Sequence, residues 1–285
     1  MAVTIANIVS GISGLAIDPA GGRAFVDVGS LQGPVTIEYA SEQEKVDIEQ
    51  DPVIVKHLLK METATLKANL AEVTYANFKN AYGYVDTTIA NTGIVGPVVP
   101  VFAPQRFSAK ITTTAPGALT TRTIILPCLH STGSVGTPFS KGVIQLLPVE
   151  WQAVRPHNLG STWVLNGTFT GNADNWTLTG GWAYGANAIS AVNSTAETAT
   201  QSITNLLAGF SYTLVFTITA YTDGNVTPSL GGTNGTARSA AGTYSQSIVA
   251  GAGNTNLVFT TAAAADFTID NVYLIPDFVV GFQDA

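Results

Sequence analysis

The sequence feature that most constrains the fold is a two-residue alternation of apolar and polar side chains. In Val35–Tyr39 the apolar residues fall on one side of an extended chain, and Thr36 and Glu38 fall on the other. Lys45–Glu49 repeats the pattern with two aliphatic residues on one side. Because successive side chains of a β-strand point to opposite faces, this period predicts two half-buried strands.

The run Leu58–Glu72 contains both a helical stripe and a strand alternation. The threonines between its apolar residues favour a strand, so we predict a third strand, with a bulge near Lys60 where the apolar phase shifts. We expect Ala40–Gln43 to separate the first two strands. Gln50–Pro52 is expected to form a turn, because proline fixes φ and cannot donate a ladder hydrogen bond.

One short helix is predicted after the third strand. Thr74 is its candidate N-cap, and Gly83 occupies the position just after its C-terminus. Tyr75, Phe78 and Tyr82 share one helical face. Since about two turns of helix are not stable alone, we expect this aromatic face to pack on the sheet.

Three later segments of the first half are predicted as strands. Arg106–Thr114 alternates with period two, and Arg122–Leu126 is rich in β-branched residues and is expected to end at Pro127. The third segment, Val143–Val154, contains Pro148, which favours an edge position or a bulge because proline cannot donate to a ladder.

Two apolar segments, residues 1–34 and 84–104, are rich in glycine or proline and have no predicted partner in the chain. An apolar loop of this length is expected to be covered by protein. We therefore interpret both segments as contacts with other subunits. The residues of the second segment assigned to these contacts are Ile94, Val95, Pro97, Val98, Val99, Val101 and Phe102.

Composition indicates a mainly β protein with two domains. Only 11% of residues are charged and 46% are hydrophobic, a balance that favours strands and turns over helices. The first 163 residues carry 11 Lys or Arg and 12 Asp or Glu, whereas residues 164–285 carry 1 and 7. Such a shift marks a domain boundary. We expect a first domain over residues 1–157, a linker over 158–163, a second domain over 164–277 and a C-terminal tail over 278–285.

The second domain is predicted to be a β-sandwich of the jelly-roll or immunoglobulin-like type. Its short apolar runs are separated by clusters of Gly, Asn, Asp and Ser at a spacing typical of such folds, about 8–12 residues. The runs are Ala188–Val192, Tyr212–Ala220, Thr243–Val249, Asn256–Thr261 and Phe267–Leu274.

The sequence argues against catalysis and sequence-specific nucleic-acid binding. The net charge is −7 and there is no basic stripe. No HExxH, CxxC, P-loop, GxSxG or GxGxxG motif occurs, so we predict that the protein is not an enzyme. Cys128 and His130 are interpreted as structural. Met1–Ile17 is apolar without a basic n-region, so we expect neither a signal peptide nor a membrane span.

Residues 30–155 resemble the major tail tube proteins of long-tailed, siphovirus-type bacteriophages. Glu42–Gln50 matches a strand of that family that ends in an acidic-Gln step. Leu66–Phe78 matches an apolar strand followed by an Ala-Glu-x-Thr step into a short helix, and Gly142–Trp151 is similar to the family's closing strand. The resemblance is a pattern of residue types over about half of the chain.

This resemblance implies a tail-tube-type sheet or barrel domain, which forms stacked hexameric rings with copies of itself and joins other tail proteins. The tube would conduct phage DNA without sequence specificity, and the protein, made in the bacterial host cytoplasm, would belong to the virion tail. Acidic residues that face the lumen would repel the phosphates of the DNA. The alternative is that these residues lie on ordinary solvated faces of strands. The candidates are Glu38, Glu44, Asp47, Glu49 and Glu62.

Residues 164–277 resemble a jelly-roll carbohydrate-binding module. The resemblance rests on Leu165–Phe169, Trp176–Leu178, Gly180–Trp182 and Phe267–Leu274. It implies exposed aromatic rings that stack on sugars, here glycans of the host surface. The candidates are Trp176, Trp182, Tyr184 and Tyr221, with core packing as the alternative for Trp176.

The second resemblance also implies an acidic residue in the last strand that holds a structural calcium ion. Asp270 matches that position, and Asn166 is the one further oxygen ligand that we can name. Calcium prefers six to eight oxygen ligands, so a turn hydrogen bond is the alternative role of Asp270. No other cofactor is expected.

Three functions remain open at this level. The chain is a tail tube subunit with an outer domain that decorates the tail, an oligomeric host-adhesion protein that binds carbohydrate, or a non-catalytic module of a polysaccharide-degrading enzyme. Tubes or six-fold rings in negative stain would support the first function alone. On that hypothesis we expect deletion of residues 164–285 to leave assembly of the first domain intact.

Overall fold

The computed structural model divides the chain into two compact units, Met1–Arg155 with Val279–Ala285, and Pro156–Phe278. Within residues 12–13, 41–48, 51–62 and 193–194 it describes the backbone alone. The residues described are 12–18, 24–48, 51–74, 76–77, 81, 106–114, 121–132, 141, 144–156, 162–194, 197–262 and 264–284.

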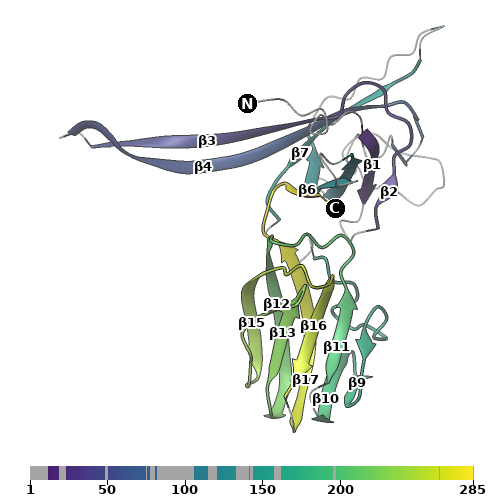
Figure 1. Ribbon diagram of the computed structural model, residues 1–285, viewed down its shortest axis with the longest axis vertical. Helices are drawn as coiled ribbons and strands as arrows, with labels where there is room; N and C mark the ends of the chain where they lie inside the picture. The colour runs from purple at the N-terminus through teal and green to yellow at the C-terminus, as the bar shows by residue number, and fades with distance from the viewer. Residues whose placement is uncertain are drawn as a thin grey trace, which may run out of the picture. The chain divides into compact units, whose positions relative to one another are not determined.

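The first unit is built on one antiparallel sheet (Figure 1). Its strand order is β2-β1-β5-β6-β7-β4-β3, and β18 pairs with β6 beside this path. The strands are β1 (Ile12–Asp18), β2 (Val26–Asp27), β3 (Thr36–Ile48), β4 (Asp51–Leu70), β5 (Phe107–Thr113), β6 (Arg122–Ser131), β7 (Leu147–Ala153) and β18 (Gly281–Asp284).

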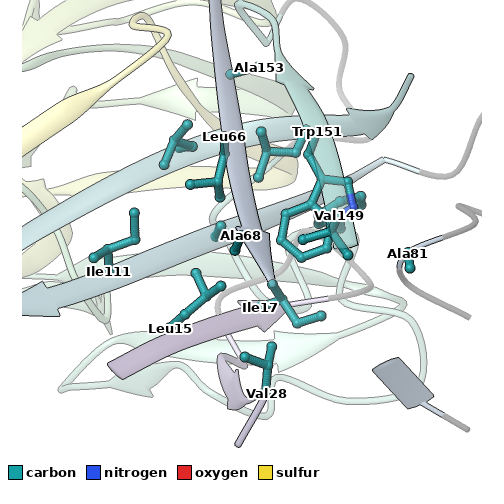
Figure 2. Packing of buried hydrophobic residues seen from close by; sticks show 14 of the residues in the cluster. Leu15, Ile17, Val28, Leu66, Ala68, Ala81, Ile111, Val149, Trp151 and Ala153 are labelled. Atoms are coloured by element: carbon teal, nitrogen blue, oxygen red, sulfur yellow. The ribbon is translucent and has the colours of Figure 1, made fainter. Parts of the chain in front are cut away.

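The core of the first unit lies against one face of this sheet. Over 63–70 of β4, and along β7, every second residue is buried, as the alternation predicts. Trp151 is fully buried and meets the Phe107 ring edge-on at 5.1 Å between centroids. Figure 2 shows Leu15, Ile17, Leu66, Ile111 and Trp151 converging from different strands. The predicted mainly β fold is confirmed.

The expectation that residues 1–34 form an arm without a partner in the chain is wrong for β1. Ile12–Asp18 pairs with β5, and its Leu15 and Ile17 are 0% and 2% exposed. Glycine density suggested a loop, but Gly14 lies where the register of β1 shifts, a position that tolerates glycine. An apolar strand with a paired edge and a buried face needs no second subunit to cover it.

β3 and β4 form one long hairpin (Figure 1). The predicted break at Ala40–Gln43 is absent, because pairing with β4 continues through it. The predicted bulge near Lys60 is confirmed: Glu42 is opposite Met61 and Gln43 is opposite Leu59, so Lys60 has no partner. The last pair joins Ile48 and Asp51, which places the reversal just before the predicted turn.

The prediction that Pro127 ends its strand is also wrong. β6 continues to Ser131, and Pro127 lies at a shift in the β5–β6 register, where Leu126 is opposite Ala109 and Leu129 is opposite Phe107. A bulge leaves one residue out of the ladder, so a proline without an N–H fits there.

The predicted step from strand to helix is present after β4. The Thr74 Oγ1 atom accepts a hydrogen bond from the Asn77 backbone N–H at 3.2 Å, which confirms the N-cap. The buried Asn77 amide donates to the carbonyls of Val28 and Glu72 at 2.7 and 2.8 Å. The Glu72 carboxylate accepts from Ser30. Tyr75, Phe78, Tyr82 and Gly83 lie outside the described residues.

β7 and β18 lie end to end along the same edge of β6. Ala153 of β7 is opposite Leu129 of β6. Gly281 of β18 is opposite Ile125, which is four residues nearer the start of β6. Both strands run antiparallel to β6. They therefore occupy the positions of one strand that is interrupted between them.

The second unit, Pro156–Phe278, is inserted in the chain between β7 and β18. The prediction of a C-terminal tail over residues 278–285 is therefore wrong, because Gly281–Asp284 forms strand β18 of the first unit. Deleting residues 164–285 removes this strand together with the second domain. The prediction that assembly survives this deletion assumed that the deletion leaves the first domain complete. That assumption is wrong, because β18 is one of the strands of the first unit.

An ion pair fastens β18 to the start of β6. Arg122 donates through Nε and Nη2 to the two carboxylate oxygens of Asp284 at 2.6 and 2.7 Å. The hydrogen bonds to Arg122 lower the pKa of Asp284 below its usual value, although desolvation opposes the shift. Such a carboxylate stabilises the fold above its unfolded pKa, and this stabilisation is lost as pH falls through the folded pKa.

We therefore expect Asp284→Asn to lower the stability of the first unit at pH 7. The difference in stability between the variant and the parent chain should shrink with acidification. It should vanish below the folded pKa of Asp284, because the protonated aspartate of the parent chain and the asparagine of the variant are then both neutral. Urea unfolding at a series of pH values measures it. A difference that persists unchanged into acid would show that the ion pair is not its source.

The second unit is a sandwich of two five-stranded sheets, ordered β15-β12-β17-β10-β9 and β14-β13-β16-β11-β8. From β10 to β13, and again from β15 to β17, each strand crosses to the other sheet, which is the arrangement of a jelly roll. The strands are β8 (Thr177–Leu178), β9 (Trp182–Gly185), β10 (Ala188–Ser194), β11 (Thr198–Ser202), β12 (Ser211–Asp223), β13 (Val226–Leu230), β14 (Thr233–Asn234), β15 (Gly242–Val249), β16 (Asn256–Thr261) and β17 (Ala265–Pro276).

All five strand runs predicted in this unit fall within β10, β12, β15, β16 and β17. The remaining strands are the short or polar ones, such as β11, whose sequence is Thr-Ala-Thr-Gln-Ser. Burial alternates over 211–218 of β12 and along β16, where every second residue enters the core between the sheets. This is why these runs could be predicted from the sequence.

Candidate functional site

The candidate assembly surface of the first unit is an arm formed by residues 40–63 of β3 and β4. β4 pairs with β7 only over Ala64–Leu70, so within the described strands the arm pairs with nothing but itself. Figure 1 shows the hairpin projecting beyond the other strands of its sheet. At about 3.4 Å per residue, the part of β3 in the arm is roughly 27 Å long. Both outer edges of such a ribbon carry unpaired backbone N–H and C=O groups.

A polar face lies at the base of this arm, on the side of the sheet opposite the core. Lys67 of β4 donates from Nζ to the Glu38 carboxylate of β3 at 2.8 Å. On β7, Glu150 is directly opposite Lys67. The hydrogen bond to Glu38 raises the pKa of Lys67, and the charge of Glu150 adds to the effect. Pro34, Thr36, Asn69 and Pro148 complete the rim of a shallow depression here.

Four of the five acidic lumen candidates lie in described strands. Glu38 lies on the polar face, is exposed, and is paired with Lys67, so its charge is partly compensated. Glu44 and Asp47 belong to β3 and Glu62 to β4, all in the arm, where the backbone alone is described. Glu49 lies outside the described residues. Repulsion of phosphate by these residues stays a prediction.

The candidate subunit-contact residues of the 84–104 segment cannot be placed on this surface. The segment lies outside the described residues, as do all seven members of the set: Ile94, Val95, Pro97, Val98, Val99, Val101 and Phe102.

In the second unit, two of the four predicted sugar-stacking residues belong to the core. Trp176 is 8% exposed, and its ring lies 5.5 Å from Phe169 and 6.1 Å from Phe259 between centroids. Trp182 is 4% exposed and packs edge-on against Phe267 at 5.6 Å. Neither ring offers a face to solvent. Core packing, the alternative given for Trp176, is therefore what the structure shows, and the sugar-stacking prediction is wrong for Trp182 as well.

The two tyrosines of the set are more accessible. Tyr184 is 38% exposed at the end of β9, and its hydroxyl donates to the Asn187 side chain at 3.2 Å. Tyr221 is half-buried in β12, where its hydroxyl donates to the Gly224 carbonyl at 2.9 Å. Sugar stacking by either ring stays a prediction.

Asp270 makes the turn hydrogen bonds that were the alternative to calcium binding. Its two oxygens accept from the Asn271 backbone N–H and side-chain amide at 2.7 and 3.0 Å. Asn271 has a φ of 54° and lies at a bulge in the β12–β17 ladder. The Asn166 amide nitrogen donates to oxygens of Asn172 and Asp174. Calcium binding by Asp270 stays a prediction.

No group of three His, Cys, Asp or Glu side chains close enough to share a metal ion occurs among the described residues. Within the same residues, no helix is both long and apolar enough to cross a membrane. Cys128 is buried, and burial followed by the charge of Arg106 lowers the pKa of His130.

Three structural residues had no local signal in the sequence. Glu72, Asn77 and Asp284 each bind groups far away in the chain, at separations of 42, 49 and 162 residues. A short polar residue beside a strand end is common, so its type alone does not reveal a distant partner. The helix cap at Thr74 was visible because its partner is three residues away.

No family model matches the chain, and no curated protein matches it. Among solved structures, it is similar to the enzymatically active domain of tailspike protein 4 of bacteriophage CBA120, with 16% identity and a TM-score of 0.31 over 42% of this chain and 22% of that one. The chain thus spans about a fifth of that protein's length.

Two further solved structures align over nearly all of the chain. One is the Dit protein of phage SPP1, described as a paradigm of the hub adsorption apparatus of phages that infect Gram-positive bacteria, with 11% identity and a TM-score of 0.28 over 93% of this chain and 99% of that one. The other is the baseplate of phage p2 in its activated conformation with Sr, with 9% identity and a TM-score of 0.29 over 95% and 97%. At these values the likenesses establish neither a shared fold nor a shared function.

Proposed function

We propose that this chain is a structural, non-enzymatic protein of a bacteriophage tail. Its first unit assembles into stacked hexameric rings that form a tube for DNA. Its second unit decorates the tail surface and binds glycans of the host.

The arm of residues 40–63 carries this proposal. A two-stranded ribbon is marginally stable in water, and its open edges invite pairing with another chain. A ring in which each arm joins the sheet of the next copy would close these edges. Contacts between successive rings would be heterologous, which is what builds an open filament.

The connection after β4 supports the same assignment. Ala71–Thr74 is the step that resembles tail tube proteins, and here it ends a core strand and caps helical residues through Thr74. The polar face at the base of the arm, with Glu38, Lys67 and Glu150, is suited to contact with water and passing DNA rather than to burial.

The insertion of the second unit between β7 and β18 supports a decorating role. It interrupts a strand beside β6 and leaves the pairing of β3 with β4 untouched. A jelly roll placed in this way can add a binding surface without altering the arm. The fold is one that lectin domains use.

Shortening the arm tests the proposal. Replacing residues 42–61 by Asn-Gly joins Ser41 to Glu62, which are opposite each other in the hairpin, through a dipeptide that favours tight turns. We expect the parent chain to form rings or tubes in negative stain and the shortened chain to remain monomeric. The core of the first unit lies outside the arm, so thermal unfolding should remain cooperative.

A matched control places the same dipeptide in the second unit. Ala186 and Asn187 form the turn between β9 and β10 with φ values of 53° and 58°, which Asn-Gly also adopts. This variant should assemble like the parent chain. Tubes formed by the shortened arm, or a parent chain that stays monomeric at high concentration, would refute the proposal.

The second candidate function is an oligomeric adhesion protein, favoured by the jelly-roll fold of the second unit. A glycan array combined with negative stain separates the two. Sugar binding without rings or tubes would favour adhesion, whereas tubes without sugar binding would leave the second unit as a cover.

A further inference from the structure

We propose that the arm of one copy pairs with the free edge of β18 in the next copy, as a strand exchanged between subunits. This deepens the proposed function and rests on its assembly part, because it names the edge of the neighbouring copy that receives the arm. The receiving edge is the side of β18 (Gly281–Asp284) that faces away from β6. We call it the β18 edge.

The register of the sheet shows which strand belongs beside the β18 edge. Ala153 of β7 is opposite Leu129 of β6 on one side and opposite Ala64 of β4 on the other. β18 follows on the line of β7 after four residues of β6. A β4 strand that continued in the sheet beyond Ala64 would therefore bring residues 57–60 beside β18.

The chain's own arm leaves this place vacant. The backbone of residues 51–62 is described, and in the described strands it pairs with β3 and makes no pair with β18. The hairpin instead projects beyond the other strands of its sheet (Figure 1). The sheet thus has an open position whose natural occupant is the sequence of the arm.

The β18 edge lacks the features that usually protect an edge strand. Natural edges carry free charges, prolines or bulges. β18 contains no proline, and its pairing with β6 shows no shift in register. Its one charged side chain, Asp284, accepts from Nε and Nη2 of Arg122, so this charge is compensated. The edge therefore offers backbone N–H and C=O groups to another strand without repelling it.

Phe282 adds an apolar contact to this edge. Its side chain is 61% exposed, and it lies opposite Ile124 of β6, which is only partly buried. The strand that carries the ring is fixed on both sides, because Val279 belongs to the core and Arg122 holds Asp284. A large aromatic ring on a fixed edge gains free energy when another strand covers it.

The composition of the arm matches this place. Residues 40–63 hold three Lys and six Asp or Glu, whereas the rest of the first unit holds eight Lys or Arg and seven Asp or Glu. Because the arm is acidic and the rest of the unit is slightly basic, contact with the body of another copy is favoured over contact between two arms. The β4 side of the arm is also rich in aliphatic residues: Val53, Ile54, Val55, Leu58, Leu59 and Met61.

Exchange of this strand also has the symmetry that the proposed assembly needs. Each copy gives one arm and receives one, so the contact is heterologous and repeats from copy to copy. The exchange closes one open edge of the arm and the β18 edge at the same time.

Cross-linking of single-cysteine variants tests the contact in the full-length chain. The native cysteine, Cys128, is buried. We expect a mixture of His57→Cys and Gln283→Cys chains to form covalent pairs with a short bis-maleimide reagent, visible on a denaturing gel. The control mixture combines His57→Cys with Ser245→Cys, an exposed position of the second unit. It should give no more pairs than either variant alone.

Phe282→Lys tests the apolar contact. It places a charge on the β18 edge, so the concentration needed for rings or tubes should rise about tenfold or more. The thermal unfolding midpoint should stay near that of the parent chain, because the Phe282 side chain is largely exposed. Val26→Lys is the matched control: Val26 is 63% exposed on β2, at the other end of the strand order. This variant should assemble like the parent chain.

Absence of covalent pairs in the first mixture, or equal effects of Phe282→Lys and Val26→Lys, would overturn the proposal. So would a cross-link within one dilute chain that carries both His57→Cys and Gln283→Cys, because the arm would then lie beside its own β18. Rings or tubes without the cross-link refute the β18 contact and leave the tail role standing. A parent chain that stays monomeric at high concentration refutes both.

Discussion

Ending the chain at Phe278 should destabilise the first unit by about 3–6 kcal/mol, although the lost residues lie beyond the entire second domain. Val279 is 8% exposed and belongs to the core cluster, and Val280 packs against it. Each buried aliphatic side chain contributes about 1.5–3 kcal/mol. The four-residue pairing of β18 with β6 and the Arg122–Asp284 ion pair are lost as well.

The variant to compare with this truncation lacks even more of the chain but keeps β18. Excising Pro156–Phe278 and joining Arg155 directly to Val279 deletes the second unit but keeps β18. Val154 still bonds to Cys128, and Gly281 is opposite Ile125, so the gap along β6 is about 10 Å. Three linking residues span this distance easily.

We expect the excised chain to unfold at nearly the same denaturant concentration as the first unit of the parent chain. The truncated chain should unfold at a clearly lower one. Near-equal midpoints for all three chains would mean that β18 contributes nothing to the first unit. Poor folding of the excised chain alone would contradict the placement of β7 and β18 as one interrupted strand.

Gly167→Ala should destabilise the second unit by about 2–5 kcal/mol. Gly167 is buried, and its carbonyl accepts from the Val272 N–H at 2.8 Å. A Cβ atom at Gly167 would lie 1.9 Å from the Val272 carbonyl oxygen. Both partners are backbone, so the start of the domain must move away from β17, and this breaks the hydrogen bond.

Gly185→Ala is the control for this substitution. A Cβ atom at Gly185 meets nothing within 4 Å, and its φ is not in the left-handed region. Tryptophan fluorescence during urea unfolding follows the second unit through Trp163, Trp176 and Trp182. Gly185→Ala should match the parent chain, and a Gly167→Ala chain of parental stability would show that the close approach is not required.

Local alternation predicted the central strands of both units because burial in this protein follows it closely. Along 211–218 of β12 and along β16 every second residue is buried, and the same holds for 63–70 of β4. The cap at Thr74 and the bulge at Lys60 could also be predicted, because each has a signal in the sequence within a few residues of its position.

The errors arose where distant pairing decides the structure. β1 contains glycine, and nothing in its local sequence indicates its pairing with β5. β18 is too short to be recognised without β6. Pro127 continues its strand because the β5 register shifts there, which nothing in the local sequence indicates. Long-range pairing thus overrode turn chemistry at these positions.

The candidate sites were less predictable than the strands. Aromatic residues at the start of the second unit could equally be core or surface, and the packing of Trp176 and Trp182 against phenylalanines decides for core.

The interrupted strand has a consequence for synthesis on the ribosome. β6 emerges early, but its partner β18 follows only after the whole second unit has been translated. At about 5–20 residues per second, the 149 residues between Ser131 of β6 and Gly281 of β18 take roughly 7–30 s. During that interval the first unit is incomplete, so a nascent chain released too soon would lack the strand that finishes it.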